Sequence, residues 1–170
     1  MLLLGLGSNL SSGFGNRFMN IDLAISYLEL YKIKLRKKSS FYETLSYPNK
    51  KNPKFINVVI EASTYLPLTD LASVLIFIEE KLERRRNKKN DPRTCDIDII
   101  DYNSKIIDFK YKNLNFTVPH KKLIYRNFVL YPLKEIVPEW KHPKTKETIN
   151  SLINKLPNDD KNSILKINKS

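Results

Sequence analysis

The chain has 170 residues and a formal net charge of +12, from 30 Lys and Arg against 18 Asp and Glu. Its length predicts one domain around one core, and a hydrophobic content of 41% is ordinary for a soluble globular protein. No apolar run approaches the roughly 18 residues of a membrane span, and no basic segment precedes the apolar start. We therefore expect a cytoplasmic protein without a membrane span. The positive charge favours an anionic partner, which is nucleic acid, a membrane surface or a phosphorylated small molecule, and of these we do not expect a membrane.

Apolar residues recur at strand and helix spacings through the first part of the chain. In chain order they predict a strand at 2–6, a helix from about 18 to 28, a strand from about 32 to 44, a loop at 45–54, a strand at 55–66, a helix from about 69 to 82 and a strand around 95–100. This order is the split βαβ pattern of ferredoxin-like α+β sandwiches. We expect an antiparallel sheet with helices packed on one face and with its other face free to bind a ligand.

The remainder of the chain is less regular. Its patterns predict a hairpin with its turn at Asn103-Ser104 and its return strand at 105–109, a helix that begins after Pro119-His120 and stops before Pro138, and a short helix at 148–156. We expect the polar tail from about 157 to 170 to be partly frayed. No repeat or linker interrupts the sequence, so residues 1–170 are expected to form a single domain.

Asp96 and Asp98 lie one residue apart in an otherwise apolar strand. Side chains alternate faces along a strand, so the two carboxylates share one face while Cys95, Ile97 and Ile99 face the core. Mg²⁺ takes carboxylate oxygens and usually shares the rest of its shell with water and substrate phosphates. The pair therefore predicts either a metal site or, as the alternative, two solvated carboxylates on an edge strand.

A basic cluster directly precedes this pair and consists of Arg84, Arg85, Arg86, Lys88, Lys89 and Arg93. Carboxylates that face several guanidinium groups suit polyphosphate chemistry, because arginines neutralise the charge that shifts in the transition state. The alternative for Arg84 and Arg85 is a solvated helix C-terminus, where positive charge is favourable. His120 is either a ligand contact or a structural residue, and Phe55 and Phe128 are either core residues or two faces that hold a flat ring. With one Cys and two His, the chain is poorly supplied with zinc ligands.

Together these residues closely resemble the 6-hydroxymethyl-7,8-dihydropterin pyrophosphokinase family of the folate pathway. The resemblance runs from residue 1 to about 140, and its most specific part is the string PRTxDxDI followed by VPH. The matching segments are Leu6-Gly7-Ser8-Asn9-Leu10, Ser39–Thr44, Phe55-Ile56-Asn57, Ile78-Glu79, Pro92–Ile99, Thr117-Val118-Pro119-His120 and Arg126-Asn127-Phe128. The family has a ferredoxin-like α+β fold, in agreement with the order of the predicted elements.

The resemblance implies transfer of a pyrophosphoryl group from ATP to the hydroxymethyl oxygen of the pterin, with release of AMP. It implies that Asp96 and Asp98 bind two Mg²⁺ ions, and that Arg84 and Arg93 contact phosphates and assist the transfer. The implied ATP contacts are Glu79, Arg86, Ile100, Thr117 and His120. The implied pterin contacts are Thr44, Leu45, Tyr47, Asn57 and, on the two faces of the ring, Phe55 and Phe128. Arg126 is expected to support the site electrostatically. We expect a monomer whose partners are ATP and the pterin, and not nucleic acid.

The chain departs from the family pattern in and around the basic loop, which is one residue shorter than usual. Glu83 stands in place of a Gly, Asn90-Asp91 in place of a Trp-Gly, Lys121 in place of a frequent aromatic, and Lys88 or Lys89 in place of a loop arginine. Lysine lacks the bidentate fork of a guanidinium. We therefore expect an active enzyme with altered loop closure.

Two other hypotheses remain open at this point. A basic α+β sandwich is also the architecture of RNA-recognition modules, but these need exposed aromatics on central strands, where this chain has Asp96 and Asp98. The second hypothesis is a non-catalytic relative that still binds pterin or nucleotide. Retention of both carboxylates together with Arg84 and Arg93 argues against it.

Overall fold

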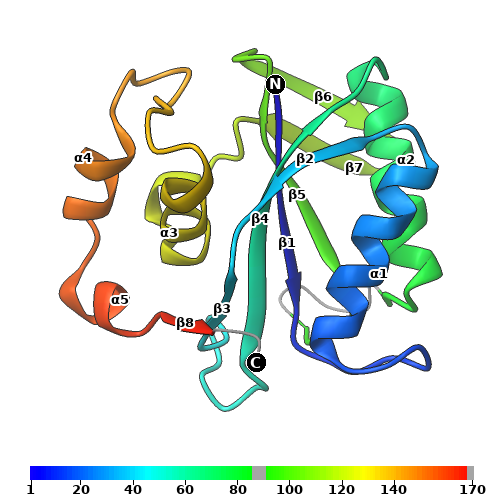
Figure 1. Ribbon diagram of the computed structural model, residues 1–170, viewed down its shortest axis with the longest axis horizontal. Coiled ribbons are helices and arrows are strands. Elements are labelled where there is room, and N and C mark those ends of the chain that lie inside the picture. The colour runs from blue at the N-terminus through cyan, green and yellow to red at the C-terminus, as the bar shows by residue number, and fades with distance from the viewer. Residues whose placement is uncertain (86–90, 168–170) are drawn as a thin grey trace.

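The computed structural model describes residues 1–85 and 91–167 (Figure 1). Its elements are, in chain order, β1 (Leu2–Ser8), α1 (Arg17–Leu30), β2 (Lys34–Lys38), β3 (Phe41–Thr44), β4 (Phe55–Ser63), α2 (Leu68–Lys81), β5 (Asp96–Tyr102), β6 (Ile107–Tyr111), β7 (Leu114–Val118), the 3-10 helix η1 (Leu123–Tyr125), α3 (Asn127–Ile136), α4 (Ile149–Asn154), α5 (Asn158–Asn162) and β8 (Leu165–Ile167). Among these residues, no helix is both long and apolar enough to cross a bilayer.

Six strands form one antiparallel sheet in the order β5-β1-β4-β3-β8, and β2 also pairs with β4. The predicted ferredoxin-like α+β sandwich is confirmed. One expected strand, from about 32 to 44, is in fact two, because the chain breaks at Ser39 and Ser40 and β2 and β3 pair with different halves of β4. The backbone N–H of Ser39 still donates to the carbonyl of Val59 at 3.0 Å, so the two strands remain on the same side of β4.

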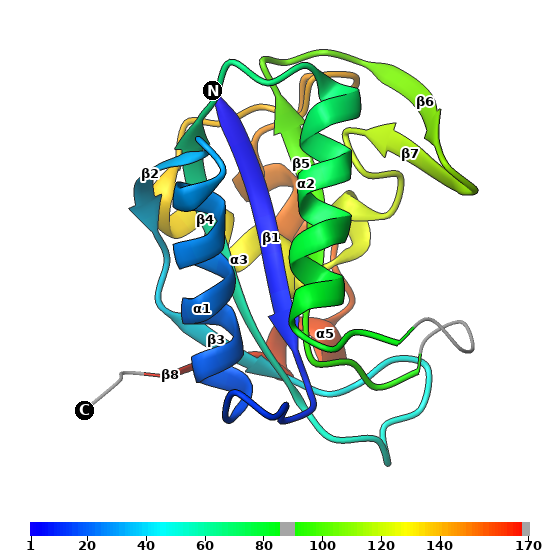
Figure 2. The ribbon, with the colours of Figure 1, turned by 90° about the vertical axis from the view of Figure 1, so that its right-hand side faces the viewer.

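The first face of the sheet is covered by α1 and α2, which lie side by side in front of β1 in Figure 2. Alternation along β1 sends Leu2, Leu4 and Leu6 into the core beneath these helices. The same period places Ile56, Val58 and Ile60 of β4 in that core, together with Ile97 and Ile99 of β5 and Cys95 directly before β5. The prediction that Cys95, Ile97 and Ile99 face the core is therefore confirmed.

The second face was predicted to be free to bind a ligand, and this prediction is wrong for the part of the face that α3 covers. The α3 helix packs across it and α4 packs on α3, on the far side of the sheet from α1 and α2 (Figures 1 and 2). Leu3, Val59 and Ile100 point into this second core, where they meet Leu130 and Leu133 of α3. Burial of the apolar stripe of α3 closes part of the face, and only the remainder is available to a ligand.

Two further predictions are also corrected. Asn103 and Ser104 do form a turn, but the chain then leaves the sheet, and β6 pairs with β7 in a separate two-stranded ribbon that was not predicted. Phe109 and Phe116 stack with ring centroids 5.0 Å apart, and both pack against the first core. The tail expected to fray contains α5 and β8, and β8 pairs with β3 because Leu165–Ile167 can extend the sheet edge.

Candidate active site

One row of residues crosses the second face of the sheet from β5 to β3. In the sheet register, Gly7 of β1 lies between Asp96 of β5 and Asn57 of β4, and Tyr42 of β3 follows Asn57. Two strand spacings separate Asp96 from Asn57, about 10 Å between their backbones. Gly7 leaves the space between them open, because a Cβ atom there would lie 3.1 Å from Asn57 Oδ1.

The two carboxylates share a face, as their spacing predicted, and both are half-buried. Asp96 accepts a hydrogen bond from Arg84 Nη1 at 2.6 Å and one from Arg93 Nε at 2.8 Å, on opposite oxygens. Arg84 also donates to Glu79, whose Oε1 in turn accepts the backbone N–H of Ile97 at 2.8 Å. Two arginines therefore hold Asp96 between them, and α2 and β5 are joined through Glu79.

Asp98 has its own arginine, which comes from the residue before α3. Arg126 Nη1 donates to Asp98 Oδ2 at 2.9 Å, across 28 positions in sequence. Together with the groups around Asp96, the site holds three carboxylates and three guanidiniums, in one cluster around Asp96 and one pair at Asp98. Burial alone would raise the pKa of Asp96, but the charges and hydrogen bonds of Arg84 and Arg93 outweigh it and hold that pKa below its usual value. Asp96 is therefore ionised at neutral pH.

A cleft of about 190 Å³ lies where α2, β5 and β7 meet. It is lined by Leu75, Ile76, Glu79, Arg84, Asp96, Ile97, Asp98, Ile99, Leu114, Asn115, Phe116, Thr117 and His120. Five residues that the sequence assigned to ATP or catalysis, besides Glu79, therefore share one cavity: Arg84, Asp96, Asp98, Thr117 and His120. Asn115 and Phe116 were not predicted, although the alternation of Leu114, Phe116 and Val118 along β7 was a readable strand signal.

His120 stands in this cleft as a neutral side chain. Its Nδ1 accepts the backbone N–H of Lys122 at 3.1 Å, which leaves the ring proton on Nε2 and free to be donated. Burial lowers the pKa of His120, and the charges of Arg126 and Lys122 act in the same direction against Asp98 and Asp96. The arrangement suits donation of a hydrogen bond to a ligand oxygen or ring nitrogen.

The residues assigned to the pterin lie on the other side of Asp96. Asn57 Nδ2 donates to Thr44 Oγ1 at 3.0 Å, and both side chains are buried. Phe55 is close to the same place, because a Cβ on Gly7 would lie 3.5 Å from its ring. The guanidinium of Arg93 lies 5.0 Å from the Phe55 centroid, so this ring also borders the phosphate-side arginines.

Phe128 approaches from α3, and its ring lies 5.4 Å from the guanidinium carbon of Arg126. Leu45 and Tyr47 are exposed, and Tyr47 shows 81% of its surface. Ile100 points into the second core, so only its main chain could meet ATP. Arg86, Lys88, Lys89 and Asn90 lie outside the described residues.

Asn9 connects the two sides of the site, and the sequence pointed to it only as part of a matching segment. Its Oδ1 accepts the N–H of Arg93 at 2.7 Å, and its own N–H donates to the Arg93 carbonyl at 3.0 Å. Its Nδ2 donates to Ser46 Oγ and to the Pro53 carbonyl. Because Asn9 is buried, it fixes the backbone of Arg93 against the loop beside Thr44.

Glu83 marks the departure at the end of α2, where the family usually has Gly. Its φ is +66°, in the left-handed region that glycine adopts most readily. Its carboxylate accepts the N–H of Gly13 at 2.9 Å, which ties the loop before α1 to the residue before Arg84. The backbone geometry typical of a glycine is therefore present, and a hydrogen bond offsets part of its strain.

The carboxylate pair fits a magnesium ion better than a metal held by protein alone. Among the described residues, no group of three or more His, Cys, Asp or Glu side chains gathers around one point. Two carboxylates at an open cleft match Mg²⁺, which keeps waters and phosphate oxygens in its shell. The two carboxylates accept hydrogen bonds from arginines, and the phosphate groups of a ligand can bind the same guanidiniums.

Comparison with known proteins identifies the family. A sequence model of the 7,8-dihydro-6-hydroxymethylpterin-pyrophosphokinase (HPPK) family matches residues 3–138. The chain belongs to this family. An HPPK-family relative from Synechocystis, named 2-amino-4-hydroxy-6-hydroxymethyldihydropteridine pyrophosphokinase, is 35% identical over 152 residues, which cover 89% of this chain and 73% of the relative. The protein of the same name from Aquifex aeolicus is 36% identical, over 82% of each chain.

Longer proteins match as well. The folic acid synthesis protein of Pneumocystis carinii is 35% identical over 95% of this chain, which spans only 21% of that protein. Among solved structures, a Plasmodium falciparum HPPK-DHPS variant with pterin and p-hydroxybenzoate superposes with a TM-score of 0.77. It covers 98% of this chain and 47% of its own, and at 19% identity this likeness shows the HPPK fold alone.

Proposed function

We propose that the chain carries out the reaction for which its family is named, transfer of pyrophosphate from ATP to 6-hydroxymethyl-7,8-dihydropterin in folate biosynthesis. The hydroxymethyl hydroxyl gives up its proton to solvent as its oxygen forms a bond to the β-phosphorus. The bond from that phosphorus to the oxygen bridging the α-phosphate breaks, and AMP leaves. The products are AMP and the pterin diphosphate.

The observation that carries this proposal is the position of Asp96 and Asp98. Both line the cleft that contains His120 and Thr117, and Asp96 begins the row that leads over Gly7 to Asn57. A nucleotide in the cleft and a pterin beside Asn57 would therefore meet at the carboxylates. Transfer between two bound substrates needs this proximity, because catalysis of phosphoryl transfer is mostly positioning and charge stabilisation.

On the ATP side, we assign Glu79, Arg86, Thr117, His120 and the main chain of Ile100 to the nucleotide. Arg84 and Arg93 are assigned to the phosphates. When ATP binds, their hydrogen bonds to Asp96 would be replaced by hydrogen bonds to phosphate oxygens. Their charge then faces the oxygens of the transferring group. Preorganised donors of this kind act most strongly on charge that develops during the reaction.

On the pterin side, we assign Asn57 and Thr44 to the polar edge of the ring, with Leu45 and Tyr47 at its rim. The buried Asn57–Thr44 hydrogen bond supports a fixed orientation of the amide. Phe55 and Phe128 are assigned to the two ring faces, since flat aromatic rings stack on one another favourably.

We assign two Mg²⁺ ions to Asp96 and Asp98, where they would supply charge neutralisation for the triphosphate. The two side chains hold carboxylate oxygens toward the cleft, and Arg126 keeps Asp98 oriented through its 2.9 Å hydrogen bond. We also propose that residues 1–170 form one domain, because both helical layers pack on the same sheet, and that the chain acts as a monomer.

A nucleic-acid-binding module is the rival function, and the geometry disfavours it. Base-binding sheets of this kind present aromatics on open central strands. Here α3 covers part of that face, and the row that crosses it begins with the carboxylate of Asp96.

The test is AMP release from ATP and Mg²⁺, with and without the hydroxymethylpterin, for the parent chain and Asp98→Ala. We expect pterin-dependent AMP in the parent and a loss of turnover in the variant. Release without pterin, or an unaffected Asp98→Ala, would overturn the proposal. Lys110→Ala, an exposed charge change on β6 outside the site, is the matched control.

A further inference from the structure

The family match ends at residue 138, yet the chain continues into two elements that return to the proposed pterin site. These are α5 and β8, which we call together the α5–β8 segment (residues 158–167). Figure 1 shows the segment passing below α3 and reaching the edge of the sheet at β3. It therefore contacts two of the elements that carry proposed pterin contacts, α3 with Phe128 and β3 with Thr44.

The contact between the α5–β8 segment and α3 is made through Asn127, the first residue of the helix. The side chain is 8% exposed, and its Nδ2 donates to the Asp160 carbonyl at 2.6 Å and to Ser163 Oγ at 3.2 Å. Its Oδ1 accepts the backbone N–H of Phe128 at 2.6 Å. A buried amide is thus satisfied by the α5–β8 segment on one side and by the first turn of α3 on the other.

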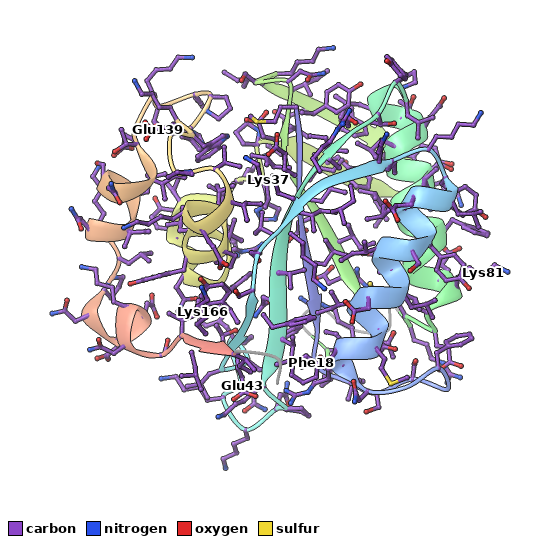
Figure 3. All side chains as sticks on the ribbon, viewed as in Figure 1. Phe18, Lys37, Glu43, Lys81, Glu139 and Lys166 are labelled. Atoms are coloured by element: carbon purple, nitrogen blue, oxygen red, sulfur yellow. The ribbon has the colours of Figure 1, made fainter. Side chains whose placement is uncertain are left out.

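The contact with β3 is made by β8 through backbone pairing, with Tyr42 opposite Lys166. Lys166, which is labelled near the lower end of α3 in Figure 3, also forms a 3.3 Å ion pair with Glu135 of α3. Glu135 accepts the Tyr42 hydroxyl at 2.8 Å and the Ser40 hydroxyl at 2.8 Å. The segment and Glu135 thus join α3 to β3 at both ends of the helix.

We propose that Asn127 is a positioning residue for pterin binding: by anchoring the first turn of α3 to the α5–β8 segment, it sets where Phe128 stands against the sheet. Asn127 lies between Arg126, which reaches Asp98, and Phe128, and its own side chain is turned to the α5–β8 segment and away from the cleft lining. The inference rests on the pterin role proposed for Phe128. It adds a determinant of substrate affinity that lies outside the site.

Asn127→Ala tests this in the full chain. The variant loses two buried donor bonds and the acceptor that orients the Phe128 amide. We expect the pterin KM, and the Kd measured from pterin fluorescence with Mg²⁺ and a non-hydrolysable ATP analogue, to rise about five- to tenfold. The ATP KM should change less than about twofold, because neither Asn127 nor Phe128 lines the nucleotide cleft. Asn158→Ala, an exposed asparagine in the same segment, is the matched control and should leave both constants unchanged.

Equal rises in both KM values, or an unchanged pterin Kd despite a lower melting temperature, would show a purely structural role and overturn the inference. Ser163→Ala removes one of the two acceptors and decides the case if Asn127→Ala does not fold. Its pterin KM should rise about twofold, and an unchanged value refutes the inference. Phe128→Ala distinguishes failure of this inference from failure of the proposed pterin site. If Phe128→Ala weakens pterin binding while Asn127→Ala does not, only the inference about Asn127 fails. If Phe128→Ala has no effect, the proposed pterin assignment itself fails.

Discussion

Replacement of Arg93 by alanine is expected to slow turnover far more than it weakens binding. A guanidinium about 4 Å from one unit of developing charge contributes about 4 kcal/mol at an effective dielectric constant of about 20. At about 1.4 kcal/mol per tenfold, this corresponds to a fall in kcat of about 10³. Because 23% of the side chain is exposed, solvent screening reduces the expectation to about 10²–10³.

The structure explains why this variant should fold. Asp96 keeps its hydrogen bond to Arg84, and the main chain of residue 93 keeps its contacts with Asn9. AMP release at saturating substrates measures kcat, and pterin fluorescence measures Kd. Arg93→Lys should fall between parent and alanine, since it retains charge without the fork. Arg36→Ala is the matched control. Arg36 lies on β2, remote from the site, and donates to Ser63 of β4, so its loss should change neither kcat nor the pterin Kd. A raised pterin Kd with unchanged kcat would refute the reasoning.

Three other expectations follow from described contacts. Gly7→Ala places a Cβ 3.1 Å from Asn57 Oδ1, so the pterin Kd should rise about tenfold while the ATP KM holds; equal binding of pterin by the variant would contradict the open row. Burial opposes ionisation of Glu135, but hydrogen bonds from Ser40, Tyr42 and Lys166 outweigh it and lower its pKa. Its stabilisation should be present above the ordinary pKa and be lost as the pH falls through the lowered value. Urea unfolding should therefore show Glu135→Gln destabilised by about 1 kcal/mol at pH 7 and level with the parent at acid pH; a constant difference would disprove the linkage. At the positive φ of Glu83, alanine should cost about 1 kcal/mol more than glycine in the same unfolding assay, and an alanine variant as stable as the glycine one would argue against strain there.

Local patterns predicted the central strands and the first helical layer well. Leu2, Leu4 and Leu6 alternate as a strand must when one face is buried, and the shared face of Asp96 and Asp98 follows from the same period. The grouping of Arg84, Thr117 and His120 with the carboxylates was predicted through the resemblance, and the cleft brings these residues together.

Long-range contacts decided what the patterns could not predict. The apolar stripe of α3 does not say which surface it will cover, and its place depends on the core with Leu3 and Val59. Trp140 adds to this by donating to the buried Asp101 at 2.7 Å, a pairing across 39 positions. Pairing of β8 with β3 likewise needs the whole fold, because three residues carry too little periodicity to be read as a strand.

Glu79 has a consequence for the solubility of the chain. In the described part of the sheet, β5 pairs only with β1, so its outer side presents backbone groups of the kind that recruit a strand from another molecule. Glu79 takes the outward amide of Ile97 with a carboxylate oxygen, and the ribbon of β6 and β7 stands beside the strand. At Ile97, Glu79 therefore occupies the backbone donor that a strand of another molecule would need, while the cleft beside it stays open.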